Sequence, residues 1–394
     1  MSIEEKNAYE ITKKLAFPRL VGTEDYKKAV GIVEEEFQRA GYDSVTREKF
    51  KTSLYSWNLS RWAFLPLSFL LVLIASSIFI NICLTLIFLV VFLLLGNKGL
   101  KMISPEEVKL SKHEKYVFDA ENVFVNLKSE NSKATVVVMA HLDSKGQFFP
   151  KIVTIILFIV PVFGFLILGV LYLILSIVMI ILLFENLVVF NVLFVVSVII
   201  AIIAGLNSFN KVNNVSSGAS DDGAGVGAII ELSRFFKKNP LENTDLTFFA
   251  TGAEELDTGG SRNFIKKHKN EFDPEKTFFI NLDSFGGKEP ARLITRFGIP
   301  KRSGSKLLAD LFLESAKELN VIVKDIYIPA GAWSDFMPMV RAGFQACWLD
   351  FSSDSIKYVH TRKDTISIIS QEALNKGILL CVDVIKKLNK KLMH

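Results

Sequence analysis

Two long stretches of the chain contain only uncharged, mostly apolar residues, and they interrupt a sequence in which polar and apolar positions otherwise alternate. Residues 62–96 carry no charge, and neither do residues 152–184 and 187–210. Uncharged apolar runs of about 18 or more residues are long enough to cross a bilayer, and these runs are too long for a buried helix of a soluble domain. The two blocks also explain why 50% of the residues are hydrophobic, which is high for a soluble protein.

Outside the blocks, hydrophobic periodicity predicts helices and strands in alternation, the pattern of an α/β layer fold. The apolar run VVVM at 136–139 predicts a strand that is buried on both faces of a sheet. Thr23 is the predicted N-cap of a helix that stops at Gly41. The predicted helices are 4–16, 23–41, 224–237, 303–319, 334–342 and 371–391, and the predicted strands are 44–50, 122–127, 134–140, 245–251, 276–283, 321–328 and 344–350.

Histidine and carboxylate side chains follow three of the predicted buried strands. In open α/β sheets the ligand crevice lies beyond the carboxyl ends of the strands, so groups in these positions are expected to converge. His141 and Asp143 also lie on the same side of an extended chain, which suits a metal ligand and the group that orients it. The residues at the three strand ends are His141 with Asp143, Glu254 with Glu255, and Asp283.

Two further stretches carry groups of the same kind. The small-residue loop GASDDG at 218–223 places Asp221 and Asp222 before a predicted helix, and His360 precedes Asp364 in KYVHTRKDT. Carboxylates gathered in one place repel one another unless a cation neutralises them. Mixed nitrogen and oxygen ligands favour zinc, with manganese or cobalt as alternatives. A dinucleotide-binding loop at 223–227 is disfavoured, because no strand precedes it and the paired acids would repel a pyrophosphate.

As an ordered set, these motifs resemble metallopeptidase family twenty-eight, the family of di-zinc aminopeptidases and glutamate carboxypeptidases. The set is H-x-D, a D-D loop opening a helix, E-E followed by a glycine-rich segment, a strand-end L-D and a late H-T-x-x-D, with PRLVG at 18–22 as a further similarity. The resemblance implies a zinc exopeptidase fold, with a mixed, mostly parallel central sheet flanked by helices. It also implies two Zn²⁺ ions per chain.

The resemblance assigns roles to individual residues. Asp221 would bridge the two ions and join Asp222 through a cis peptide bond, and Glu254 would act as the general base. The implied metal ligands are His141, Asp221, Asp283, Glu255 and His360; Glu254 and Asp143 are the implied catalytic residues, Asp222 and Asp364 the supporting residues, and Tyr358 and Asp335 the candidate substrate contacts.

Two positions depart from the family pattern. The family often has a tyrosine immediately before the last histidine, where it helps to hold the oxyanion, whereas this chain has Val359 there and Tyr358 one place earlier. The family's S-D-H segment reads Ser334-Asp335-Phe336. These departures bear on substrate preference more than on metal binding.

The order of motifs and apolar blocks restricts the membrane topology. His141 precedes the second block and Asp221 follows it, so both can reach one metal only if the block crosses the bilayer an even number of times. The same reasoning applies to the first block, and hairpin turns are expected near Asn81 and Glu185. We therefore predict four transmembrane helices, in hairpins at 61–97 and 152–206, inserted into a peptidase domain made of 1–60, 98–151 and 207–394.

The charges that flank the blocks predict an orientation. Lysine and arginine lie on the peptidase side of the blocks and are missing from both turns, so the positive-inside rule predicts a multi-pass membrane protein with a cytoplasmic catalytic domain. The net charge of +5 is modest, and no basic run suggests a nucleic-acid partner. The flanking basic residues are Arg47, Lys49, Lys51, Arg61, Lys98, Lys101, Lys145, Lys151 and Lys211.

Together these observations predict a membrane-embedded zinc aminopeptidase with peptide substrates and the lipid bilayer as partners. About 10 residues separate His141 from the second block, at most ~33 Å of chain, so the active site is expected close to the membrane surface. Two alternatives remain open: a glutaminyl-cyclase-like acyltransferase of the same fold with one zinc, and a non-catalytic membrane scaffold. Aminopeptidase and carboxypeptidase specificity also remain undecided.

Overall fold

The chain folds into two compact units, each assembled from segments that are far apart in the sequence. The computed structural model describes residues 7–103, 109–183 and 185–391. The sheet unit spans 1–53, 106–151 and 212–394, and the helical unit spans 54–105 and 152–211.

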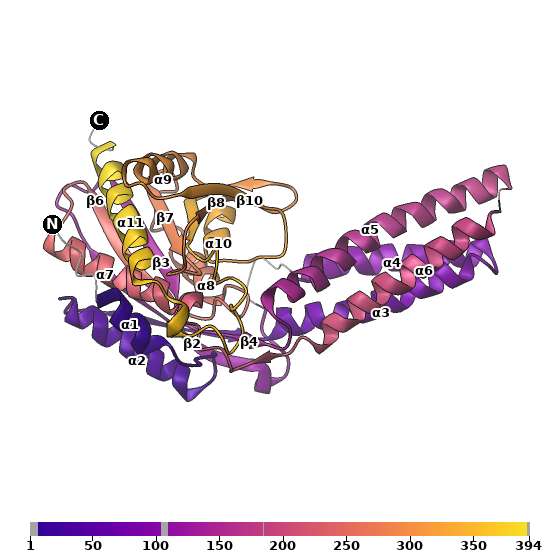
Figure 1. Cartoon of the computed structure of the whole chain (residues 1–394), viewed down its shortest axis with the longest axis horizontal. Helices are drawn as coiled ribbons and strands as arrows, with labels where there is room; N and C mark the ends of the chain where they lie inside the picture. The colour runs from indigo at the N-terminus through magenta and orange to yellow at the C-terminus, as the bar shows by residue number, and fades with distance from the viewer. Residues whose placement is uncertain (1–6, 104–108, 184, 392–394) are drawn as a thin grey trace. The chain divides into compact units, whose positions relative to one another are not determined.

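A mixed sheet forms the centre of the sheet unit (Figure 1). Strand β3 pairs in parallel with both β6 and β7, and β7 pairs in parallel with β11, whereas β1, β2 and β6 pair antiparallel. The predicted mixed, mostly parallel sheet flanked by helices is therefore confirmed. Across the sheet the order is β1 (Thr46–Ser53), β2 (Val117–Leu127), β6 (Thr244–Thr251), β3 (Ala134–His141), β7 (Thr277–Leu282), β11 (Gln345–Asp350), β8 (Ala291–Phe297) and β10 (Val323–Ile328), with β9 (Arg302–Ser303) paired to β8.

The alternation of side chains along the central strands supplies two hydrophobic cores, one on each face of the sheet. Phe248 of β6 stacks on Phe236, which belongs to α7 (Ala224–Lys238). The next residue, Phe249, packs on the opposite face against Phe264 of α8 (Gly259–His268). Every residue of β6 and β7 is buried, because helices cover both faces of these strands. The remaining helices of this unit are α1 (Asn7–Leu15), α2 (Glu24–Arg39), α9 (Lys306–Glu318), α10 (Phe336–Arg341) and α11 (Gln371–Lys391).

The predicted elements agree with the observed ones except at a few places. The hydroxyl of Thr23 accepts a hydrogen bond from the Tyr26 amide at 3.2 Å, which confirms the predicted N-cap of α2. Residues 4–6 of the first predicted helix lie outside the described residues. Helix α9 begins at Lys306 rather than at 303, because Arg302 and Ser303 pair with β8 and Ser305 caps the helix. Helix α8 and strand β8 are not among the elements predicted from the sequence.

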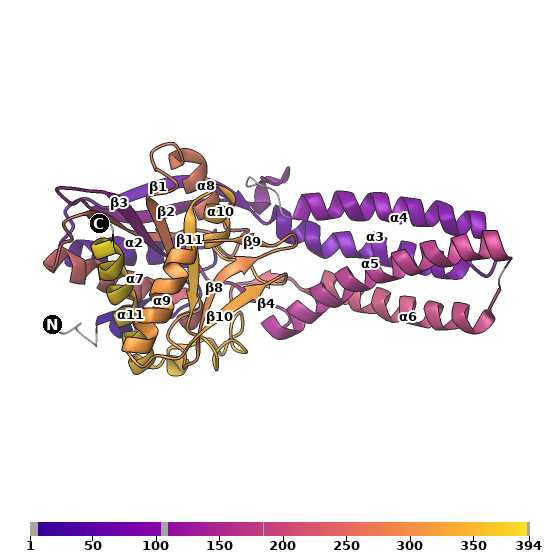
Figure 2. The same ribbon diagram turned by 90° about the horizontal axis from the view of Figure 1, so that it is seen from above.

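The two apolar blocks form the helices of the helical unit (Figure 2). Aromatic side chains hold these helices together: Phe165 of α5 packs against Phe64 of α3 and Phe92 of α4. The hydroxyl groups of Tyr172 and Ser197 are 3.0 Å apart and connect α5 with α6. The four helices are α3 (Tyr55–Ser77), α4 (Ile82–Ile103), α5 (Lys151–Leu182) and α6 (Leu187–Leu206).

Both predicted turns contain an asparagine that caps the following helix. The Asn81 side chain accepts hydrogen bonds from the amides of Cys83 and Leu84 at the start of α4. The Asn186 side chain accepts hydrogen bonds from Val188 and Val189 at the start of α6. A tight hairpin in each block is therefore observed, near the predicted positions.

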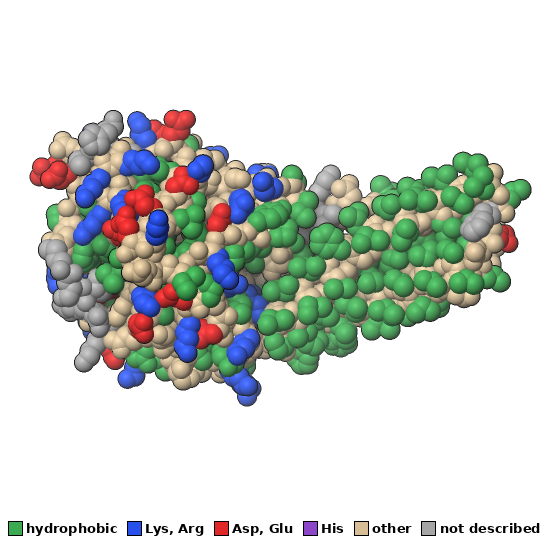
Figure 3. Space-filling view, turned by 45° about the horizontal axis from the view of Figure 1, so that its top comes forward, with side chains coloured by type: hydrophobic (Ala, Val, Ile, Leu, Met, Phe, Trp, Pro, Cys, Tyr) green, Lys and Arg blue, Asp and Glu red, His purple; other side chains and the backbone are tan. Residues whose placement is uncertain are grey.

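The outward face of the helical unit is apolar over nearly its whole length (Figure 3). Soluble monomers rarely expose apolar patches larger than a few hundred Å², so this surface is unsuited to water. Within the described residues, three helices are long and apolar enough to cross a membrane: α3, α5 and α6 with its short extension to Phe209. The prediction of four such helices is corrected here, since the apolar part of α4 is shorter and ends at Lys98.

The central strands give a prediction on stability. Phe279 of β7 is fully buried and packs edge-on against Phe344, so Phe279→Ala should lower the free energy of unfolding by about 3–5 kcal/mol. Thermal unfolding of the detergent-solubilised protein measures the change. Ile299→Ala, at a position that is 68% exposed, is the control and should leave the midpoint nearly unchanged. Equal midpoints for the two variants would contradict this description of the core.

Candidate metal centre

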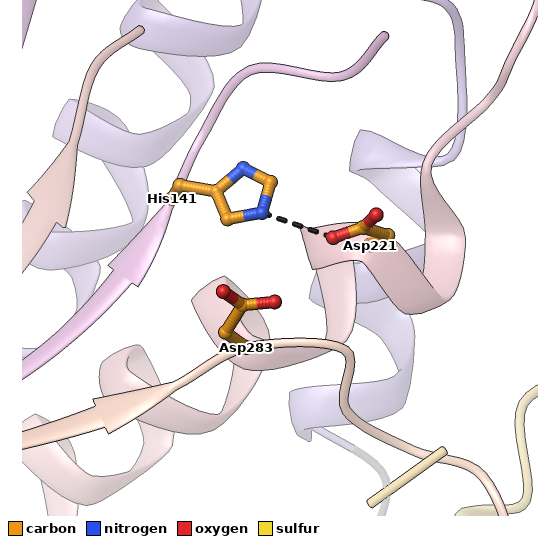
Figure 4. Close-up of side chains that lie close together, drawn as sticks. All are labelled: His141, Asp221 and Asp283. Atoms are coloured by element: carbon orange, nitrogen blue, oxygen red, sulfur yellow. Dashed lines mark hydrogen bonds and ion pairs between the residues drawn. The ribbon is translucent and has the colours of Figure 1, made fainter. Parts of the chain in front are cut away.

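The carboxyl ends of β3 and β7 and the loop before α7 bring the predicted ligands of the first ion together (Figure 4). His141 is the last residue of β3, Asp283 follows β7, and Asp221 lies in the turn that leads into α7. The Nε2 atom of His141 lies 3.1 Å from Oδ1 of Asp221. One potential ligand atom from each of the three residues lies within 4.8 Å of the others, and all three side chains are buried.

A second group shares Asp221 with the first. His360 Nε2 lies 3.2 Å from Asp221 Oδ2 and 3.1 Å from Glu255 Oε1. The potential ligand atoms of Asp221, Glu255 and His360 also lie within 4.8 Å of one another. The two oxygens of the Asp221 carboxylate therefore face different histidines, which is the arrangement that a bridging ligand requires.

Two buried oxygens in this centre lack a hydrogen-bond donor. Among the described residues, neither Asp221 Oδ2 nor Glu255 Oε1 accepts a hydrogen bond. Buried polar atoms in folded proteins are almost always satisfied, and a bound cation would satisfy both of these oxygens. Each group offers nitrogen and oxygen donors and three protein ligands, which fits zinc with a position left for water or substrate. The residues present thus fit two zinc ions.

Two aspartates around the ligands support the backbone instead of facing the centre. Asp222, joined to Asp221 by a cis peptide bond, accepts hydrogen bonds from the amides of His141 at 3.2 Å and Gly225 at 3.1 Å. Asp364 accepts hydrogen bonds from the amides of Ser220 at 2.7 Å and Asp221 at 3.3 Å. These contacts fix the end of β3 and the Asp221 loop relative to each other.

The structure gives Asp143 a different set of contacts from the one expected. The Nδ1 atom of His141 lies 3.1 Å from the main-chain carbonyl oxygen of Asp143 and 3.6 Å from its carboxylate. The Asp143 carboxylate instead accepts hydrogen bonds from the amides of Glu254 at 3.1 Å and Glu255 at 3.3 Å. Asp143 therefore holds the Glu254-Glu255 turn in place, and the ring of His141 is oriented mainly by a backbone carbonyl.

The surroundings shift the pKa values of the two adjacent glutamates in opposite directions. Burial, with the nearby carboxylates of Asp283 and Glu255, raises the pKa of Glu254 well above its ordinary value. Burial also raises the pKa of Glu255, but the charges of His360 and Lys145 outweigh it and lower that pKa to about 2. Glu255 is thus an anion that can serve as a ligand, whereas Glu254 holds a proton more readily than an ordinary glutamate.

Arg19, a residue of the PRLVG segment, connects the parts of the chain on both sides of the second apolar block. Its buried guanidinium donates hydrogen bonds to the carbonyl oxygens of Leu142 at 2.7 Å, Ser217 at 2.6 Å and Gly218 at 2.9 Å. Leu142 precedes the block and the other two residues follow it. Arg19 therefore holds together two segments of the metal centre that the second apolar block separates in sequence.

Two lysines that were counted among the flanking charges are part of the centre. Lys145 Nζ lies 2.8 Å from Glu255 Oε2, and Lys151 Nζ lies 3.8 Å from Asp221 Oδ2. Both side chains are largely buried, with exposed fractions of 7% and 18%. The ligand carboxylates account for the positions of these two basic residues, so the predicted orientation depends on the other flanking charges.

The two candidate substrate contacts lie outside the ligand groups. Asp335 is buried, and its carboxylate accepts a hydrogen bond from the hydroxyl of Thr251; its substrate contact stays a prediction. Tyr358 is half-buried with its ring beside the ammonium of Lys357, and its proposed contact stays a prediction.

Comparisons with known proteins agree with this geometry. The fold matches a zinc aminopeptidase from Bacillus subtilis (TM-score 0.57, 14% identity, 98% of this chain and 95% of that chain). It also matches an aminopeptidase from Aneurinibacillus sp. strain AM-1 (TM-score 0.58, 15% identity, 98% and 93%) and a glutaminyl cyclase from an Acidobacteriales bacterium (TM-score 0.54, 14% identity, 99% and 96%). The fold is therefore that of the zinc aminopeptidases and their glutaminyl-cyclase relatives.

The sequence comparisons point to one peptidase family. Residues 198–385 match the sequence model of peptidase family M28. Aminopeptidase YwaD of Bacillus subtilis (strain 168) is 27% identical over 168 residues, which are 41% of this chain. The match spans only 36% of the length of YwaD. These matches agree with the resemblance stated from the motifs: the chain is similar to peptidase family M28 over residues 198–385.

The backbone contacts of Asp364 give a prediction on metal binding. Asp364→Asn places an amide NH₂ where one carboxylate oxygen now accepts an amide hydrogen, which disturbs the Asp221 loop. We expect zinc affinity to fall by about 10–100-fold, the usual effect of removing a residue that supports a metal ligand. Competition with a chromophoric chelator measures the affinity. The control is Asp325→Asn, whose carboxylate pairs with Arg296 on β8, and equal zinc affinity in the two variants would contradict the prediction.

Proposed function

We propose that the protein is a membrane-embedded, zinc-dependent exopeptidase that removes amino-terminal residues from peptides. The observation that carries the proposal is the pair of ligand groups joined at Asp221, with Glu254 beside them. The match to peptidase family M28 over residues 198–385 and the zinc aminopeptidase fold support the same activity.

The proposed metal ligands are those that the two groups supply. His141 and Asp283 would hold one zinc ion, Glu255 and His360 would hold the other, and Asp221 would bind both. When bound, the ions polarise the scissile carbonyl and lower the pKa of the attacking water. Asp222 and Asp364 would keep the bridging carboxylate in place through their hydrogen bonds to the backbone.

Glu254 is the proposed general base. Its Oε2 atom lies 3.9 Å from His141 Nε2, next to the first ligand group, and its backbone amide is held by Asp143. Glu254 would accept a proton from water and pass it to the leaving amine. Its raised pKa suits this function, because the carboxyl group must hold the proton between the two transfers.

A glutaminyl-cyclase-like acyltransferase is the second candidate. It is supported by the structural match to the cyclase from the Acidobacteriales bacterium, which covers nearly all of both chains. The contact of Lys145 with Glu255 also supplies a positive charge to the second ligand group, which would favour occupancy by one zinc. A zinc content of one per chain together with cyclisation of amino-terminal glutamine would favour this candidate.

The sheet pairing supports an even number of membrane crossings in each apolar block. Strands β1 and β2 pair along their length although α3 and α4 separate them in sequence, so the first block must return the chain to its starting side. His141 and Asp221 impose the same condition on α5 and α6. At 1.5 Å per residue, the 20 residues of α6 span about 30 Å, which matches the hydrocarbon core.

Glu254→Gln tests the proposed chemistry. The amide cannot accept the proton, so kcat for aminoacyl-arylamide hydrolysis should fall by about 10²–10⁴-fold. Zinc content and thermal stability should remain those of the wild type, because Glu254 belongs to neither ligand group. Wild-type turnover in this variant would show that Glu254 is not the general base. If the zinc-loaded wild type hydrolysed none of the peptides, the proposed peptidase activity would be refuted.

Cysteine labelling tests the topology. In a background with Cys83 replaced by serine, Cys347 and Cys381 are buried, so a single introduced cysteine reports its own side of the membrane. A membrane-impermeant maleimide should label Glu185→Cys in intact cells, and it should label Lys276→Cys on the sheet unit only after permeabilisation. Labelling of Lys276→Cys in intact cells would refute the proposed cytoplasmic orientation.

A further inference from the structure

The two lysines of the metal centre differ in how closely they contact a carboxylate. Lys145 Nζ is 2.8 Å from Glu255 Oε2 and also 3.5 Å from the carbonyl oxygen of Glu255. Lys151, the first residue of α5, reaches Asp221 Oδ2 only at 3.8 Å. Lys145 is thus engaged by a ligand residue through an ordinary charged hydrogen bond, whereas Lys151 is not.

Lys151 has one ion-pair contact among the described residues, and that contact is with a proposed metal ligand. Asp221 Oδ2 is also one of the two buried oxygens without a hydrogen-bond donor. If a cation binds this oxygen, the ammonium of Lys151 loses its partner and is repelled by the cation. A largely buried ammonium then requires another anion.

The other carboxylates around the centre have functions or partners of their own. Asp283 and Glu255 would bind the ions, and Glu254 is the proposed general base. Asp143 and Asp222 accept backbone amides, as does Asp364. Asp350 pairs with Arg292 and accepts hydrogen bonds from Ser352. An anion supplied by the substrate is the remaining partner for Lys151.

We propose that Lys151 determines substrate specificity by binding a carboxylate of the peptide next to the scissile bond. The carboxylate is either the side chain of an amino-terminal Glu or Asp or the free α-carboxylate of a dipeptide. The same charge disfavours substrates with a lysine or arginine side chain in that position. This inference rests on the proposed function, and it narrows the substrates to acidic ones.

Four peptides distinguish the two sources of the carboxylate. Glu-Ala-Ala-amide and Gln-Ala-Ala-amide differ only in the side-chain charge, and Ala-Ala and Ala-Ala-amide differ only in the terminal carboxylate. For the zinc-loaded wild type we expect kcat/KM to be at least about tenfold higher for the charged member of one pair. In Lys151→Met this ratio should fall towards one, and in Lys151→Arg it should be largely restored.

Binding provides a readout that does not depend on turnover. In the Glu254→Gln background, calorimetry should show the charged peptide of the preferred pair binding at least about tenfold more tightly than its neutral partner. Adding Lys151→Met should remove that difference. Lys276→Met, which removes an exposed lysine paired with Asp273, is the matched control and should preserve the difference.

The outcomes separate this inference from the proposed function. Ratios near one for both pairs in the wild type, or ratios that Lys151→Met leaves unchanged in hydrolysis and binding, would overturn the assignment of Lys151. If the wild type still hydrolysed neutral peptides in that case, the exopeptidase proposal would remain intact. Charge-selective binding without hydrolysis of any peptide would support Lys151 and refute the exopeptidase.

Discussion

The structure depends on one carboxylate that two histidines share. Asp221 directs one oxygen toward His141 and the other toward His360, and neither histidine is near it in sequence. The surrounding groups hold this arrangement in place: Asp222 and Asp364 bind the backbone, Asp143 holds the Glu254-Glu255 turn, and Arg19 joins the segments on either side of the second block. Because negative charge is concentrated there, the folded centre is best satisfied by cations.

The contacts of Asp221 also show where in the sequence the second apolar hairpin is inserted. Each apolar hairpin leaves and re-enters the sheet unit between segments that pair or meet there: β1 with β2, and His141 with Asp221. The helices α3 to α6, with their hydrophobic surface, therefore form a unit separate from the sheet unit. It supplies attachment to a bilayer, as proposed, while the sheet retains the ligand groups.

Much of this arrangement was predictable because it follows from local patterns. Buried strands ending in His141, Glu254 or Asp283 had to bring those residues to one edge of a mostly parallel sheet. Helix α8 was missed because it opens with Gly259-Gly260 and is short, and β8 because it lies between two turns that contain Pro290 and Pro300. The functions of Arg19, Lys145 and Lys151 could not be read from the sequence. Arg19 contacts Leu142 across 123 positions, and both lysines looked like ordinary charges beside a membrane span.

The guanidinium of Arg19 has a consequence for biosynthesis. Its acceptors lie on both sides of the second hairpin, and His360 comes later still, near the carboxyl end of the chain. During translation, the amino-terminal helices and β3 emerge before α5 and α6, yet the residues that complete the centre emerge only after both helices. Assembly of the centre therefore follows synthesis of both helices of the second hairpin, and a chain that ends before them contains only part of the centre.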